Sequence, residues 1–148
     1  MGLFAIFDIN SAGLSVEQSR LAVTASNIAN SRTTRTADGG IYQPLAVAVR
    51  SVTLSGDAAL DGSESLDATR LPRPVVGDVV ATTVAPRMVY DPGHPDADAR
   101  GFVALPGVDP IASMLDLMSI SRSYEANLRA FDITRNLIQR TLDLGRSR

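Results

Sequence analysis

The hydrophobic positions of this chain follow a helical period near both ends and a strand-like period only in between. Apolar residues spaced three, four and seven apart share one helix face, and they predict helices over 3–30 and 109–143. Residues 31–108 instead combine short alternating segments with turns rich in proline and glycine. The pattern predicts an α+β fold, in which long terminal helices pack as a coiled-coil-like pair beside a small β-rich middle region.

The first predicted helix carries apolar residues on two opposite sides. One series recurs every seven residues and consists of Phe7, Leu14, Leu21 and Ile28. A second series has the same period and consists of Ile9, Val16 and Val23. The offset of two positions between them corresponds to about 200° around a helix. One packed neighbour cannot cover both sides, so this helix is expected to have several neighbours.

The last predicted helix begins at Asp109 and Pro110, an N-cap residue followed by proline at the first helical position. Its main stripe again recurs every seven residues and consists of Leu117, Tyr124, Phe131 and Ile138. Further residues widen this stripe, namely Met114, Leu128 and Leu142. The opposite side carries Ala126, Ala130, Ile133 and Leu137. A helix of this length with two apolar sides favours assembly over the ordinary core of a monomeric two-helix hairpin.

The middle region is predicted to contain short strands, at 45–50, 78–84, 87–90 and 101–105. Residues 55–74 are acidic, rich in serine and glycine and closed by prolines, which predicts a mobile surface loop. The expected organisation has three parts: an N-terminal assembly helix at 1–30, a β/loop middle region at 31–108 and a C-terminal assembly helix at 109–148.

Composition excludes several classes of chemistry. The net charge of −2 argues against a nucleic-acid partner, because such proteins normally present a basic face. The sequence contains neither cysteine nor lysine, which excludes thiol nucleophiles, zinc–thiolate sites and Schiff-base lysines. No apolar run approaches the roughly 18 residues of a membrane span. The apolar N-terminus lacks the basic segment of a cleaved secretory signal, so none is expected.

One segment, 89–101, is a candidate for solution chemistry, because it places His94 close to Asp91 and two further aspartates. A metal-dependent hydrolase centred on Asp91 and His94 is the enzymatic alternative. The prolines and glycine around His94 predict a structural turn, however, and a single histidine offers no second nitrogen ligand for zinc. We therefore expect no catalytic residue, metal or cofactor. A soluble helical adaptor is a further alternative.

The first helix is expected to end at Asn27 and Asn30. Their side chains can bond backbone groups that a helix end leaves open, either in the same chain or in an adjacent subunit. The predicted assembly interface consists of Phe7, Leu14, Val16, Leu21, Val23, Asn27, Ile28, Asn30, Leu117, Tyr124, Asn127, Leu128, Phe131 and Ile138.

Three stretches together resemble the bacterial flagellar rod and hook protein family. Residues 14–30 (LSVEQSRLAVTASNIAN) carry the two asparagines typical of its N-terminal helix. The central stretch resembles the proximal rod subunits through Tyr90, Asp91, Pro92, His94, Pro95, Gly101, Val108 and Asp109. The C-terminal stretch resembles the closing helix of the family through Ser121, Arg122, Tyr124, Ala126 and Asn127.

This resemblance implies a non-enzymatic subunit of the proximal rod, which is the periplasmic drive shaft of the flagellar basal body. It implies contacts with copies of the same chain, other proximal and distal rod proteins and the rod-to-ring adaptor. It also implies export by the flagellar type III apparatus without a cleaved signal peptide. The terminal helices are then expected to form the inner tube and to be poorly ordered before assembly, while the middle region faces outward.

Overall fold

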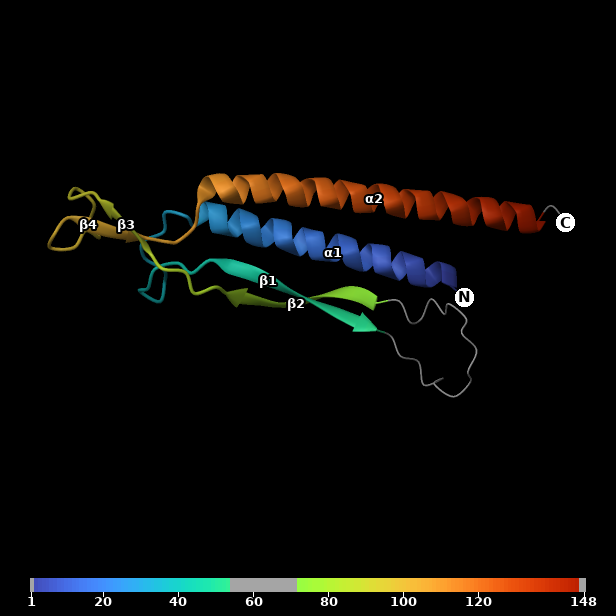
Figure 1. Ribbon diagram of the computed structural model, residues 1–148, viewed down its shortest axis with the longest axis horizontal. Coiled ribbons are helices and arrows are strands. Elements are labelled where there is room, and N and C mark those ends of the chain that lie inside the picture. The colour runs from blue at the N-terminus through green and yellow to red at the C-terminus, as the bar shows by residue number, and fades with distance from the viewer. Residues whose placement is uncertain (1, 54–71, 147–148) are drawn as a thin grey trace. The chain divides into compact units, whose positions relative to one another are not determined.

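The computed structural model describes residues 2–53 and 72–146 (Figure 1). The elements along the chain are α1 (Gly2–Ala29), β1 (Leu45–Thr53), β2 (Pro72–Ala81), β3 (Arg87–Tyr90), β4 (Phe102–Leu105) and α2 (Pro110–Arg146). These elements confirm the predicted α+β class, with a long helix near each end of the chain and small two-stranded sheets between them.

The described residues fall into two compact units, each of which is treated by itself below. The first unit contains residues 2–19, 49–53, 72–77 and 121–146. The second contains residues 20–48 and 78–120. Each helix therefore contributes one part to each unit.

The start of α2 follows the predicted capping pattern. The Asp109 carboxylate accepts hydrogen bonds from the Ile111 N–H at 2.9 Å and the Ala112 N–H at 3.4 Å. Pro110 occupies the first helical position, where its missing N–H leaves no intrahelical bond unmade. Asp109 therefore satisfies backbone donors that the first turn of a helix leaves open, which confirms the predicted N-cap.

Along α2, the half-buried positions from the second turn onward alternate between spacings of three and four residues. They are Ser113, Leu117, Ile120, Tyr124, Asn127, Phe131, Thr134 and Ile138. This spacing keeps one narrow stripe on a single helix face. The predicted main stripe of Leu117, Tyr124, Phe131 and Ile138 thus lies on the covered side of the helix.

Few of the described side chains are fully buried in either unit. In the first unit, Val16 of α1 is only 4% exposed. In the second unit, Val103 of β4, Pro106 and Val108 are buried. Pro106 and Val108 lie in the short segment of sequence between β4 and α2. Burial of these few side chains is supplemented by many half-buried apolar positions along both helices.

The four strands form two pairs. β1 is the neighbour of β2, and Figure 1 draws their arrows in opposite directions. β3 pairs with β4 in antiparallel register, with Met88 opposite Ala104 and Tyr90 opposite Phe102. The strand predicted at 87–90 is confirmed, and the one predicted at 101–105 begins one residue later, at Phe102.

β2 begins earlier than predicted. The sequence prediction placed residues up to 74 in a loop and started a strand at 78, but β2 runs from Pro72 to Ala81, so both boundaries are wrong. Prolines were interpreted as loop residues, yet Pro72 and Pro74 are two apart, and the N–H groups of such positions point to the same strand edge. One edge can therefore lack both donors while the other still pairs. The rest of the predicted loop, 55–71, lies outside the described residues.

Over the described ranges, neither helix combines the length and hydropathy that crossing a membrane requires.

Candidate assembly site

The first half of α1 contacts the second half of α2 within the first unit. The rings of Phe7 and Phe131 meet edge to face, with centroids 4.9 Å apart. Asn10 donates a hydrogen bond of 3.4 Å to the Thr134 hydroxyl. The Asn127 side-chain amide lies beside Gly13, where an added Cβ would stand 3.5 Å from its nitrogen. The structure thus brings predicted interface residues from the two helices together inside one chain.

The other predicted interface residues differ in how far the chain itself covers them. Val16 is buried, while Leu128 is 43% exposed. The half-buried ones are Leu14, Leu21, Val23, Asn27, Ile28, Asn30, Leu117, Tyr124 and Ile138. Their contacts with a neighbouring subunit stay a prediction.

Many of the exposed large apolar side chains among the described residues belong to α2. Ile133 and Leu137, on the predicted second side of this helix, are 69% and 59% exposed. A further group near the helix start consists of Ile111, Met114, Leu115 and Met118, all more than half exposed. Sequence reasoning did not place Ile111, Leu115 and Met118 in the interface. Their spacing of four and three residues on one helix face was the signal available.

The end of α1 is joined to the start of β1 by the side chain of Asn27. Its Nδ2 donates to the Leu45 carbonyl oxygen at 2.8 Å, and its Oδ1 accepts from the Leu45 N–H at 2.8 Å. The Tyr42 hydroxyl donates to the same Oδ1 at 2.9 Å. Of the two possibilities that the sequence left open for Asn27, the structure shows bonds within the same chain.

Asn30 acts on the helix end itself. Its Nδ2 donates to the Ser26 carbonyl oxygen at 2.9 Å, and its Oδ1 accepts from the Thr33 hydroxyl at 3.1 Å. The Ser31 hydroxyl, on a buried residue, donates to the Ile28 carbonyl oxygen at 2.7 Å. The same two carbonyl oxygens also accept from the Asn30 and Ser31 backbone N–H groups, so these side chains add a second hydrogen bond to each carbonyl of the last turn. The two asparagines therefore have different roles, one at the strand and one at the helix end.

The connection between β3 and β4 is organised by Asp98 and Gly101. One Asp98 carboxylate oxygen accepts from the Phe102 N–H at 2.9 Å and from the Arg100 N–H at 2.8 Å. The hydrogen bond from Phe102 is the main reason why the pKa of Asp98 lies below its ordinary value. Gly101 adopts a φ of +81°, which L side chains rarely tolerate.

Asp96 ties the segment after α1 to the turn that contains His94. Its carboxylate accepts from the Thr34 hydroxyl at 2.7 Å and forms an ion pair of 3.1 Å with Arg35. The Asp96 N–H donates to His94 Nδ1 at 3.1 Å, and the His94 N–H donates to the Asp91 carbonyl oxygen at 3.2 Å. His94 and Asp96 thus form turn contacts, in agreement with the structural interpretation of this segment.

The hydrolase alternative lacks a ligand set. Across the described part of the chain, no three His, Asp or Glu side chains are grouped so that they would hold a metal ion. His94 Nδ1 accepts from the Asp96 backbone N–H, and no contact within residues 2–53 and 72–146 pairs this imidazole with a nucleophile.

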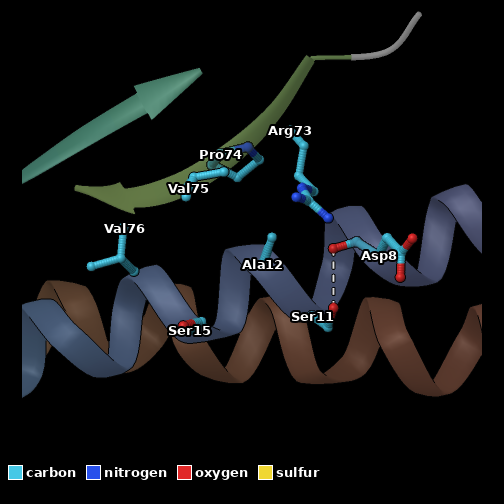
Figure 2. Close-up of a pocket in the computed structure, with 8 residues that line it drawn as sticks. All are labelled: Asp8, Ser11, Ala12, Ser15, Arg73, Pro74, Val75 and Val76. Carbon is cyan, nitrogen blue, oxygen red and sulfur yellow. Dashed lines mark hydrogen bonds between the residues drawn. The ribbon is translucent and has the colours of Figure 1, made fainter. Parts of the chain in front are cut away.

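The first unit contains an open cleft of about 330 Å³ between α1 and β2. Figure 2 shows Arg73 of β2 directed toward α1 near Asp8 and Ser11. The Arg73 Nε atom is buried and has no hydrogen-bond partner in the structure. Val75 and Val76 continue the cleft wall opposite Ala12 and Ser15. β2 therefore lies beside part of α1. The polar groups that line this cleft form no nucleophile–base pair.

Comparisons with known proteins match both ends of the chain to flagellar rod families. The family described as "Flagella basal body rod protein" matches residues 7–35, which include Asn27 and Asn30. The family described as "Flagellar basal body rod FlgEFG protein C-terminal" matches residues 99–144, which include Asp109 and most of α2.

Curated relatives cover almost the whole chain. The flagellar basal-body rod protein FlgC of Escherichia coli O6:H1 is 37% identical over 98% of this chain and 99% of its own length. The proteins of the same name from Aquifex aeolicus and Bacillus subtilis are 34% and 31% identical, over 97% and 99% of this chain and 97% and 100% of their own lengths. Similarity of this extent, together with the asparagine pair and the capped closing helix, shows that the chain belongs to the FlgC family of flagellar basal-body rod proteins.

Proposed function

We propose that this chain is a structural, non-enzymatic subunit of the flagellar rod, and that it assembles through the exposed apolar side of α2. The observation that carries the proposal is the exposure of Ile133 and Leu137 on the side opposite the covered stripe of the same helix. Monomeric proteins rarely expose a row of large apolar side chains to water, and here the row lies along a helix of 37 residues.

Assembly gives these side chains a partner. Burying an exposed Leu or Ile side chain fully contributes about 1.5–3 kcal/mol, so a few of them supply much of the free energy of a subunit contact. A contact between two different surfaces of identical or related subunits does not close into a dimer but continues as a helical array. In such an array the two helices of each subunit form the wall, and torque passes through many contacts in parallel.

The proposed organisation keeps the three predicted parts. The α1 and α2 helices are assembly elements that pair in a coiled-coil-like manner, supported by the three–four spacing of the half-buried α2 positions and the Phe7–Phe131 contact. The middle region faces outward. The partners are copies of this chain, other proximal and distal rod proteins, the rod-to-ring adaptor and the type III export apparatus, and the location is the periplasmic part of the basal body.

A charge placed at an exposed α2 position tests the proposal. Ile133→Asp is expected to leave the monomer folded, because the side chain is 69% exposed, and to abolish incorporation into basal bodies and swimming. Asn136→Asp is the matched control, since it adds the same charge at an exposed polar position of the same helix. Swimming and rod incorporation are measured in cells that carry each variant as the sole copy. Normal swimming of Ile133→Asp would overturn the proposed surface.

The same surface separates the remaining alternatives. A soluble adaptor with a fixed number of partners predicts a closed oligomer in sedimentation, whereas the rod interpretation predicts open-ended assembly. Phe131→Asp serves as a second test. It places a charge at a contact inside the subunit, so it is expected to disrupt the contact with Phe7 as well as assembly. Loss of monomer folding in Phe131→Asp but not in Ile133→Asp is the expected difference.

A further inference from the structure

We propose that Asn27 is a positioning residue whose side-chain amide takes the place of a neighbouring β-strand and thereby fixes where β1 leaves the end of α1. Its role in local structure is independent of the rod assignment, while its consequence for assembly rests on the proposed function.

The bonding pattern of Asn27 is that of a strand residue. In an antiparallel pair, two opposed residues exchange both N–H···O=C bonds. Asn27 makes the equivalent pair of bonds with its side chain, donating to the Leu45 oxygen and accepting from the Leu45 nitrogen, each at 2.8 Å. One side-chain amide therefore satisfies both backbone groups of the first residue of β1.

The opposite edge of the chain at this point is held by Thr82. The Pro44 carbonyl oxygen accepts from the Thr82 N–H at 2.7 Å, just beyond the end of β2. Backbone groups of consecutive residues in an extended chain point to opposite edges, so Asn27 and Thr82 hold the start of β1 from its two sides. Asn27 thus covers a strand edge that would otherwise present unpaired groups.

Tyr42 completes the arrangement and accounts for the choice of asparagine. Its hydroxyl donates to Asn27 Oδ1 at 2.9 Å, so this oxygen accepts two hydrogen bonds and uses both of its lone pairs. The site needs an acceptor of two bonds and a donor of one bond at the same distance from the helix. Aspartate offers no donor when ionised, leucine offers neither group, and glutamine moves the amide outward by one methylene.

The consequence for the rod is a fixed exit direction. The last turn of α1 lies in the helical assembly element, and Leu45 begins the strand that leads into the middle region. Because Asn27 bonds both backbone groups of Leu45, the helix end and the strand start move together rather than about the intervening loop. In an assembled rod this coupling would keep the middle region of each subunit at one angle to its helix.

Amide hydrogen exchange of the purified full chain tests the local role. In Asn27→Leu the protection factor of the Leu45 amide is expected to fall at least tenfold, because its acceptor is lost. Asn30→Leu is the matched control, since Asn30 makes no bond to β1, and it should leave Leu45 protected. The Asp91 amide, which donates to the Gly101 oxygen in the same unit, is the internal reference for intact folding.

Asn27→Asp gives a readout that a purely space-filling role would not give. At neutral pH the introduced carboxylate can still accept from the Leu45 N–H, but its second oxygen faces the Leu45 carbonyl oxygen without a donor. Because the repulsion between these two oxygens opens the contact, Leu45 protection is expected to fall. Acidification supplies an O–H donor at the same place, and protection relative to the unsubstituted chain is expected to rise again. Asn27→Leu has no titratable group and should show no such recovery.

Two results would overturn the proposal: Leu45 without protection in the unsubstituted chain, or equal Leu45 protection in the chain and in Asn27→Leu with Asp91 intact. Both are measured on the monomer and do not depend on rod assembly. Failure of the Asn27 tests together with loss of swimming in Ile133→Asp would reject the strand-like role alone. The reverse combination would reject the assembly surface and keep the role of Asn27.

Discussion

The two helices differ in how far their own chain covers them. Along α1 the exposed positions from the second turn onward are polar or small, and apart from Arg20 they form one stripe: Asp8, Ser11, Ser15, Gln18, Ala22, Ala25 and Ala29. With the exception of Ile6 and some alanines, the described apolar residues of α1 are half-buried or buried. Along α2 a single stripe is half-buried, and large apolar side chains such as Ile133, Leu137 and Leu142 are more than half exposed.

The difference follows from what lies beside each helix within the first unit. α1 has α2 on one side, at Phe7 and Gly13, and β2 on another, at Ala12 and Ser15. Two sides of α1 thus have neighbours in the same chain, and Val16 of its second apolar series is 4% exposed. The second side of α2 stays largely exposed among the described residues of its unit, so the proposed subunit contact falls on α2.

Shortening one apolar side chain in each helix tests most directly whether α1 is covered by its own chain more fully than α2. Val16→Ala is expected to lower the free energy of unfolding by about 2–3 kcal/mol, because Val16 is 4% exposed and its truncation leaves a cavity. Leu137→Ala should change stability by less than about 0.5 kcal/mol, as surface substitutions usually do.

Chemical denaturation of the two monomers measures their loss of stability. Rod incorporation of each variant is measured separately. Leu137→Ala should weaken incorporation although its monomer is as stable as the unsubstituted chain. Equal losses of stability in the two variants would mean that α2 is covered within the chain to the same degree as α1, and the contrast would then be lost.

The sequence predicted the covered stripe of α2, but it predicted two open apolar sides for both helices and therefore no difference between them. The seven-residue recurrence of Leu117, Tyr124 and Phe131 identifies the covered stripe, because spacing alone fixes a helix face. The same reasoning gave α1 two open sides. It could not show that β2 lies beside α1, since Pro72 and Pro74 resemble loop residues in sequence and their strand depends on long-range pairing.

The Asn27 contact shows the same limit at the level of one residue. The position near a helix end predicts bonds to backbone groups, which is local information. The partner, Leu45, is eighteen residues away, and its position depends on the path of residues 31–44 and on Thr82 from beyond β2. No periodicity in the sequence encodes that contact.

A pair of glycines extends the comparison to the second unit and separates strain from packing. Gly39 and Gly101 have nearly the same φ, +80° and +81°, but nothing lies within 4 Å of a Cβ added at Gly39. At Gly101 the added Cβ would stand 2.9 Å from Tyr90 Cε2. Gly39→Ala is expected to cost about 1–2 kcal/mol for the left-handed backbone alone, and Gly101→Ala more, because Tyr90 must shift.

Thermal or urea unfolding of both variants gives the difference directly. A larger loss for Gly101→Ala means that the β3–β4 turn, like α1, is packed by its own chain. Tyr90 packs edge to face on Phe102 with centroids 5.3 Å apart, so its displacement should also appear in the near-ultraviolet circular dichroism of Gly101→Ala. Equal losses in the two variants would show that Tyr90 yields without cost and that the turn is held only by its backbone.

The smallest expected effect concerns the side of α1 that faces β2, where the buried Arg73 Nε lacks a hydrogen-bond partner. Arg73→Met keeps the aliphatic stem over α1 and removes the buried Nε donor that has no partner. Because an unsatisfied buried donor carries a desolvation penalty, we expect the stability to rise, by no more than about 1 kcal/mol. Arg140→Met, at an exposed position of α2, is the control and should change nothing measurable. A loss of stability in Arg73→Met alone would show that the guanidinium makes a favourable electrostatic contribution beside Asp8, so that α1 is held on this side by charge as well as by apolar contact.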